Sequence, residues 1–390
     1  MTNFPRRVLA SLALVCLTLA AGPAAPKGVS YQILFHGFSG GAGVMPTRGL
    51  FAGEAENLYG IASEGGASGA GVVFKLAPDG SETVLYAFTG GNDGAIPDGP
   101  VTMDNHGNIY GTTYEGGTAN LGTVFEIAPD GTETVLHSFA GGTDDGANPQ
   151  GGVTIGENRR LYGATEWGGA NDVGTVFVLH PSGRLRVLHS FAGSDGEGPQ
   201  GGVILDGQGN IYGATLQGGA GNTGTVYKVA PDGSENVLYA FLNGFDGGLA
   251  NSGLMMDETG NLYGTTLGGG DDYSGVVFKV TQSGTESVLH SFTGGADGGT
   301  PYATMIQDKH GDLYGTAAYG GAYGFGVVFK LAPDGTETVL HSFASGADGD
   351  TPYAGLITDP ALGGGYLYGT TSGAACYGCG FNGTVYKIKK

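Results

Sequence analysis

The sequence predicts an all-β fold: a seven-bladed β-propeller with four antiparallel strands per blade, in which the N-terminal strand closes the last blade. Three motifs predict this fold, because each recurs seven times with a period close to 50 residues. The tyrosine of Leu/Ile-Tyr-Gly falls at Tyr59, Tyr110, Tyr162, Tyr212, Tyr263, Tyr314 and Tyr368. The aromatic residue of a Val-Phe or Val-Tyr pair falls at Phe74, Phe125, Phe177, Tyr227, Phe278, Phe329 and Tyr386. A strand typified by Val-Leu-His-Ser-Phe ends at Phe38, Phe88, Phe139, Phe191, Phe241, Phe292 and Phe343.

The order of the motifs predicts how the ring closes. The first strand of the third kind, residues 31–38, precedes the first Leu-Tyr-Gly, and the last unit stops at residues 384–388 without such a strand. Each end of the repeat array therefore lacks what the other end carries. Pairing the first strand with the last sheet completes seven blades and leaves no exposed sheet edge.

One repeat contains four strand patterns in order. Residues 101–104 alternate apolar and polar side chains, and an Asn-His-Gly-Asn turn leads into residues 109–114. A Gly-Gly loop leads to residues 123–128, and a Pro-Asp-Gly turn leads to residues 132–139. Antiparallel alternation then places the Gly-Gly loops and the long linkers between blades on one face, named here the top face. The two tight turns lie on the opposite, bottom face.

The recurring segments LYGTTxxGG, GTVFKLxPDGTETVLHSF and GGxDGxxP resemble the GloVer tandem-repeat family of secreted bacterial proteins, which are variously anchored at the surface. The resemblance covers about residues 31 to 388. It implies export and a repeat architecture, and it brings no established activity or catalytic residue. The chain departs from family members that carry a C-terminal anchor, which favours a form free of the membrane.

The N-terminus has the pattern of a signal peptide over residues 1–25. Arg6 and Arg7 precede a short apolar run and then small residues, and the run is too short to span a bilayer. We therefore expect a secreted or periplasmic protein consisting of one propeller over residues 29–390. No second long apolar segment follows, so no membrane span is expected after cleavage, and we expect a monomer.

The charge balance bears on partners. The formal net charge is −20, and it becomes about −22 when Arg6 and Arg7 leave with the signal. A chain this acidic is a poor match for nucleic acid, whose phosphates require basic side chains. The acidity attracts cations without specifying a ligand.

Aspartates recur in the linker motif Asp-Gly-x-x-Pro and could hold calcium, which binds six to eight oxygen ligands. No single loop has the dense acidic spacing of a dedicated calcium site. We interpret these aspartates mainly as turn and capping residues, with calcium as the one cofactor to consider. The residues are Asp145, Asp195, Asp297 and Asp348.

Two further sets resemble ligand sets. Five histidines occupy one strand position in successive blades, where tyrosine replaces them twice, so their spacing follows the repeat and indicates a structural role. They are His36, His137, His189, His290 and His341. Cys376 and Cys379 lie in the last blade, and in an exported protein they predict a local disulfide.

Departures from the repeat are better candidates for function, because packing does not require them. Two variable positions follow each Gly-Thr-Thr core and begin the top-face loops. Aromatic rings beside carboxylates and amides suit sugar rings, so these positions predict a ligand site on the top face. The candidates are Tyr114, Glu115, Glu166, Trp167, Gln217 and Tyr319.

The sequence therefore favours an exported propeller without catalytic residues that binds a glycan or a protein at the cell exterior. The alternative is a carbohydrate-active enzyme, a polysaccharide lyase or hydrolase. In that case Glu115 and Glu166 could act as acid and base if they lay at a suitable separation. No nucleophile motif is present, and a propeller fold alone does not indicate catalysis.

Overall fold

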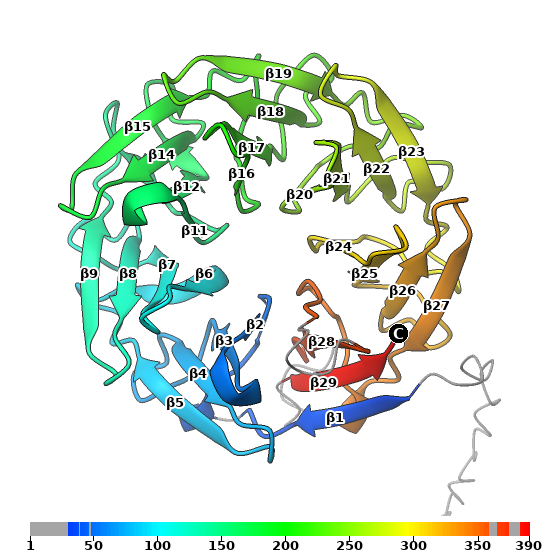
Figure 1. The fold of residues 1–390 in the computed structure, drawn as a ribbon, viewed down its shortest axis with the longest axis horizontal. Coiled ribbons are helices and arrows are strands. Elements are labelled where there is room, and N and C mark those ends of the chain that lie inside the picture. The colour runs from blue at the N-terminus through cyan, green and yellow to red at the C-terminus, as the bar shows by residue number, and fades with distance from the viewer. Residues whose placement is uncertain (1–29, 39, 47, 359–364, 374–382) are drawn as a thin grey trace, which may run out of the picture.

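The computed structural model describes residues 30–38, 40–46, 48–358, 365–373 and 383–390. Seven β-sheets stand around a central axis like the blades of a propeller, each with one edge toward the axis and the other at the rim (Figure 1). The predicted signal peptide and the pair Cys376 and Cys379 lie outside the described residues. In the described part of the chain no helix is long and apolar enough to cross a membrane.

Six blades are four-stranded sheets whose strands pair in chain order from the axis to the rim. Blade 1 is β2 (Phe51–Ala52), β3 (Leu58–Ala62), β4 (Val72–Leu76) and β5 (Glu82–Ala87), and blade 2 is β6 (Ala95–Met103), β7 (Ile109–Glu115), β8 (Thr123–Ile127) and β9 (Glu133–Ser138). Blade 3 is β11 (Thr154–Ile155), β12 (Leu161–Thr165), β14 (Thr175–Leu179) and β15 (Leu185–Ser190), and blade 4 is β16 (Ile204–Leu205), β17 (Ile211–Ala214), β18 (Thr225–Val229) and β19 (Glu235–Ala240). Blade 5 is β20 (Met255–Met256), β21 (Leu262–Thr265), β22 (Val276–Val280) and β23 (Glu286–Ser291), and blade 6 is β24 (Ile306–Gln307), β25 (Leu313–Ala317), β26 (Val327–Leu331) and β27 (Glu337–Ser342).

Blade 7 joins the two ends of the chain. Its sheet is β28 (Tyr366–Thr371), β29 (Thr384–Lys389) and β1 (Tyr31–Phe35), with β1 antiparallel to β29 and Tyr31 opposite Ile388. At its innermost place an isolated bridge from Ile357 to Tyr368 stands where the other blades have a short strand. The predicted closure by the N-terminal strand is confirmed, and the fourth strand of this blade is reduced to that bridge.

Short elements complete the chain. One further strand pair, β10 (Gly146–Ala147) with β13 (Trp167–Gly168), and isolated bridges such as Glu197 to Gln217 join each linker to the Gly-Gly loop of the blade that it enters. Linkers and Gly-Gly loops therefore share the top face, as predicted. The single-turn 3₁₀ helices are η1 (Gly40–Ala42), η2 (Glu54–Glu56), η3 (Glu157–Arg159) and η4 (Gly346–Asp348).

Within each blade, the glycine of Leu-Tyr-Gly faces an aromatic ring on the next strand. Gly111 pairs with Phe125, and a Cβ atom built on Gly111 would lie 2.5 Å from Cζ of that ring. Real side chains do not approach so closely, so the ring occupies the space that any larger residue would need. This contact explains why the second and third strands carry Gly and an aromatic residue in all seven repeats.

A second aromatic contact joins neighbouring blades. The phenylalanine that ends each outer strand meets the aromatic residue of the third strand in the following blade, with ring centroids 5.0 to 5.5 Å apart in edge-to-face geometry. The three repeated motifs thus converge in a single cluster at every blade boundary. The seven pairs are Phe38–Phe74, Phe88–Phe125, Phe139–Phe177, Phe191–Tyr227, Phe241–Phe278, Phe292–Phe329 and Phe343–Tyr386.

Glutamates begin most outer strands and face the linker aspartate of the preceding blade. Burial, and to a smaller extent the charge of Asp195, raises the pKa of Glu235 to about 7. Burial and the corresponding aspartates raise the pKa of Glu133, Glu286 and Glu337 to about 7 as well. Blade 3 has Leu185 at this position, so the fold does not require a carboxylate here.

The hydroxyl of Tyr227 generates a first prediction. It is buried without a hydrogen-bond partner among the described residues, whereas phenylalanine stands at this position in five blades. An unpaired buried hydroxyl costs about 1–3 kcal/mol. We expect Tyr227→Phe to raise the free energy of unfolding by about 1 kcal/mol, measured as a higher urea midpoint by circular dichroism. The reverse change Phe278→Tyr should lower the midpoint, and a lower midpoint for Tyr227→Phe would contradict the argument.

A second prediction concerns pH. A folded-state pKa of about 7 for Glu235 lies above the ordinary value of 4.5, so the folded protein binds more protons between these values and loses stability as the pH rises through them. Glu235→Gln should therefore melt at a higher temperature than the native chain at pH 8 and at the same temperature at pH 4. The exposed Glu258, changed to Gln, is the control with an equal change of charge. Equal shifts in both variants would disprove a role for burial.

Candidate ligand-binding site

The inner segments of all seven blades surround a cavity of about 290 Å³ on the propeller axis. Its wall contains apolar residues of the inner segments, among them Leu50, Val153 and Leu356. Around the cavity the segments pack backbone against backbone: a Cβ atom on Gly151 would lie 2.5 Å from the carbonyl oxygen of Gly201. The residues at these positions must therefore be small, and the polar side chains around the cavity come from neighbouring positions.

In the six blades where the position is described, one residue directly follows the linker and lies at the top-face mouth of the cavity. In most blades it comes directly after the linker proline, and its identity changes from blade to blade. Five of these residues line the cavity, and the sixth, Asp98, contacts Arg48 of the lining. The five are Gln150, Gln200, Asn251, Tyr302 and Tyr353. Polar residues stand on the side of blades 2 to 5, and tyrosines stand on the side of blades 6 and 7.

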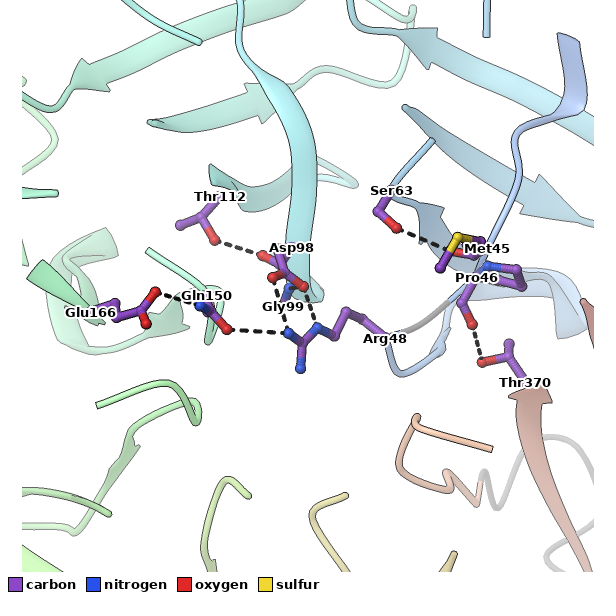
Figure 2. Close-up of polar contacts among 10 residues, drawn as sticks. All are labelled: Met45, Pro46, Arg48, Ser63, Asp98, Gly99, Thr112, Gln150, Glu166 and Thr370. Atoms are coloured by element: carbon purple, nitrogen blue, oxygen red, sulfur yellow. Dashed lines mark hydrogen bonds and ion pairs between the residues drawn. The ribbon is translucent and has the colours of Figure 1, made fainter. Parts of the chain in front are cut away.

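Arg48 breaks the repeat at the next position, where the other blades have Gly, Ser or Ala. Its Nε donates to Oδ1 of Asp98, and its Nη2 donates to Oδ2 of Asp98 at 3.0 Å and reaches Oε1 of Gln150 at 3.5 Å. The other terminal nitrogen points away from Asp98 in Figure 2 and has no dashed contact there. Arg48 and Asp98 thus form a fork-shaped ion pair at the mouth.

Glu166 is the centre of a second group of contacts. Its Oε2 accepts from Nε2 of Gln150 at 2.6 Å and from the hydroxyl of Tyr114 at 3.1 Å, and its Oε1 accepts from Nε2 of Gln200 at 2.8 Å. An ionised carboxylate only accepts, so it fixes both amides with their nitrogens toward Glu166. The carbonyl oxygen of Gln150 is left to face Arg48 (Figure 2), and Gln200, whose amide nitrogen is held by Glu166, lines the cavity.

Tyrosines form the facing wall. The rings of Tyr302 and Tyr353 meet edge to face with centroids 4.8 Å apart, and the hydroxyls of Tyr319 and Tyr353 share a hydrogen bond of 2.9 Å. Burial raises the pKa of Tyr302 and Tyr353, and burial with the charge of Glu166 raises the pKa of Tyr114 to about 12. All three hydroxyls are therefore neutral near pH 7 and can both donate and accept.

The residues predicted from the sequence fall into two groups. Tyr114, Glu166 and Tyr319 join the contacts at the mouth. Trp167, 39% exposed, pairs with Ala147 of a linker and its side chain also interacts with the hydroxyl of Tyr114. Glu115 and Gln217 lie opposite linker residues. The sequence analysis did not predict six residues at the mouth, although in five of them variation directly after the linker proline is the same kind of signal. They are Arg48, and then Asp98, Gln150, Gln200, Tyr302 and Tyr353.

The linker aspartates lie apart from one another, each at its own blade boundary. Asp145 accepts from the backbone nitrogen of Ala140 at 3.0 Å and lies 3.1 Å from Nε2 of His137. Asp195 and Asp348 lie 2.9 and 3.1 Å from Nε2 of His189 and His341 in the same way, whereas Asp297 lies 3.7 Å from Nε2 of His290, beyond hydrogen-bond distance. In the described ranges one group, His189, Asp195 and Glu235, has ligand atoms within 4.8 Å of one another. Calcium prefers oxygen ligands to imidazole, and calcium binding here stays a prediction.

Comparison with known proteins agrees with the repeat structure. The family model described as the Gloeobacter/Verrucomicrobia repeat matches the chain twice, over residues 24–207 and 161–386. A search of curated proteins finds no significant match.

Similar solved structures share the fold at low identity. The extracellular domain of a one-component system from B. thetaiotaomicron has a TM-score of 0.58 and 10% identity, covering 91% of this chain and 39% of that chain. A puromycin hydrolase has a TM-score of 0.53 and 10% identity, covering 86% and 53%. A gluconolactonase from Xanthomonas campestris reaches a TM-score of 0.49 and 14% identity over 95% of both chains. Identities this low extend to the fold alone.

The ion pair at the mouth is testable by a double-mutant cycle. Arg48 and Asp98 have side chains only 28% and 14% exposed, so we expect a coupling energy of about 1.5–3 kcal/mol from Arg48→Ala, Asp98→Ala and the double variant. Unfolding in urea gives the three values. The control pair is Arg159 and Asp104, in which the arginine is 58% exposed, and its coupling should stay below about 1 kcal/mol. Equal couplings would mean that the mouth pair is solvated.

Proposed function

The chain belongs to the Gloeobacter/Verrucomicrobia repeat family, and we propose that it is an exported, non-enzymatic propeller that binds a glycan at the top-face mouth of its central cavity. One observation carries this proposal: tyrosine rings on one side of the mouth face a set of oriented amide, carboxylate and guanidinium groups on the other side. A sugar ring offers the matching surfaces, an apolar face of C–H groups and a rim of hydroxyls that both donate and accept.

The arrangement suits a saccharide in three respects. Tyr302 and Tyr353 supply rings that are held by contacts with each other and with Tyr319. Gln150 and Gln200 present carbonyl acceptors in a fixed orientation, because Glu166 holds their amide nitrogens. Groups whose rotamers are already fixed lose little entropy on binding. A cavity of about 290 Å³ lies near the lower limit for small-molecule pockets, which favours the end of a glycan over a folded protein.

Export is part of the proposal. It rests on the signal-peptide pattern of residues 1–25 and agrees with the extracellular placement named for the B. thetaiotaomicron domain of similar fold.

A carbohydrate-active enzyme is the alternative function. Asp98 and Glu166 both lie at the mouth, on either side of Gln150, and two carboxylates are the usual equipment for cleaving a glycosidic bond. Both are occupied, Asp98 by Arg48 and Glu166 by three neutral donors. These contacts hold the two carboxylates as parts of a binding wall, so we favour binding without turnover.

The test is a screen of the purified protein against neutral and acidic polysaccharides, with binding measured by calorimetry and product release by reducing-end assay. We expect binding without product, and a loss of affinity of about tenfold in Tyr353→Ala and in Gln200→Ala, because each removes one wall contact worth about 1–2 kcal/mol. Val288→Ala, an exposed apolar residue on an outer strand, is the control. Steady product release would favour the enzyme, and the absence of any binding would reject both functions.

A further inference from the structure

Exposed apolar side chains are concentrated in one sector of the ring. Seven large hydrophobic side chains are exposed among the described residues, and six of them fall between residues 242 and 323, in blade 5, blade 6 and the linker into blade 5. Trp167 is the seventh. On the top face the sector contains Leu242, Phe245, Tyr273, Tyr319 and Tyr323, which are 64%, 77%, 71%, 47% and 41% exposed.

This sector is continuous with the mouth of the cavity. Tyr319 shares its hydroxyl hydrogen bond with Tyr353, which borders the cavity. Tyr323 lies four residues further along the same top-face loop, 318–326, whose backbone turns at Gly320, Gly321 and Gly324 with φ of 74°, 79° and 82°. Tyrosine rings therefore lead from the cavity onto the loop of blade 6.

Tyr273 is an exposed ring of this sector whose backbone conformation costs free energy. It has φ of 56° at a loop position where other blades have Asn120 and Asp172, whose side chains accept from backbone nitrogens of Gly116 and Gly168 at 3.0 Å. A tyrosine cannot make that contact, and a left-handed conformation costs a residue other than glycine about 1 kcal/mol or more. Its ring lies 71% exposed, so packing does not account for it.

The charges of the top face restrict the ligand. Arg48 is the one lysine or arginine of the described chain that lies on this face, and Asp98 neutralises it. The remaining basic residues lie in bottom-face turns, in the third and C-terminal strands or, for Arg186, near the start of the outer strand β15, where its side chain donates to the carbonyl oxygen of Pro231 in a bottom-face turn. They are Lys75, Arg159, Arg160, Arg184, Arg186, Lys228, Lys279, Lys309, Lys330, Lys387, Lys389 and Lys390. The sector of exposed apolar side chains between residues 242 and 323, named here the aromatic sector, also contains Asp246, Asp271 and Asp272. An anionic polymer would meet like charge there.

Given the glycan-binding function proposed above, we propose that the ligand is a neutral oligosaccharide chain, with its end in the cavity mouth and its following sugars stacked along Tyr319 and Tyr323 across blade 6. Single aromatic rings separated by glycine-rich backbone suit successive sugar rings, each of which needs one apolar platform. The site therefore selects for chain length as well as for the terminal sugar.

Calorimetry tests the proposal with cello-, chito- and manno-oligosaccharides from the monosaccharide to the hexasaccharide, together with polygalacturonate as the anionic polymer. For the series that binds, affinity should rise at least tenfold with length. Tyr323→Ala should weaken the hexasaccharide about tenfold and leave the monosaccharide or disaccharide unchanged, whereas Tyr302→Ala should weaken every length. Tyr323→Phe should retain affinity, because it keeps the ring. Thermal midpoints equal to that of the native chain confirm that the variants fold.

The outcomes separate the two proposals. Equal affinity at all lengths, or equal loss of all lengths in Tyr323→Ala, would overturn the chain-binding inference while the glycan-binding function stands. Tighter binding of polygalacturonate than of every neutral series would overturn the charge assignment. Binding of none of these saccharides, with a protein recovered on the aromatic sector instead, would overturn both.

Discussion

The structure depends on the edge-to-face aromatic pair at each blade boundary. The phenylalanine that ends the outer strand of each blade packs against an aromatic ring of the next blade. These rings are 0 to 2% exposed. Burying one such ring contributes about 1.5–3 kcal/mol, and the pair geometry adds about 0.5–1.5 kcal/mol. Because contacts in a repeat protein are between neighbours, the boundary formed by Phe38 and Phe74, which joins blade 7 to blade 1, is as important to stability as the others.

The invariant contacts leave a small number of positions free to vary. Glycine beside the aromatic ring is required by a contact that every blade repeats, and in most blades small residues around the axis and aspartate beside the outer strand are required by contacts of their own. The residue that follows the linker and borders the cavity has no such contact in common, and it is Gln150 in one blade and Tyr353 in another. Variation is therefore concentrated at the mouth of the cavity, since the described copies of one unconstrained position meet there.

The sequence predicted the fold more fully than the site, for a physical reason. The period of the motifs predicts the number of blades, and the order of the motifs predicts how the ring closes. Each motif is local in the sequence, and the ring follows from its repetition. The site depends on contacts between blades: Arg48 reaches Gln150, 102 residues away, and Gln200 reaches Glu166 across a blade boundary. Tyr114 and Glu166 were predicted individually, and their hydrogen bond was not. Arg48 was not predicted, because the prediction for the linkers rested on their repeated aspartates. A single arginine that replaces a small residue in one blade gives no periodic signal.

Closure of the ring also builds the site. Arg48 comes from the linker that leaves blade 7, and Tyr353 from the linker that enters it, so they border one cavity only because β1 completes the sheet of β28 and β29. The Thr370 side chain donates to the carbonyl oxygen of Pro46 at 2.9 Å across the same junction (Figure 2). Opening blade 7 would separate the guanidinium from the tyrosines while leaving six blades intact. The closure of blade 7 and the arrangement of side chains at the mouth therefore depend on the same strand pairing.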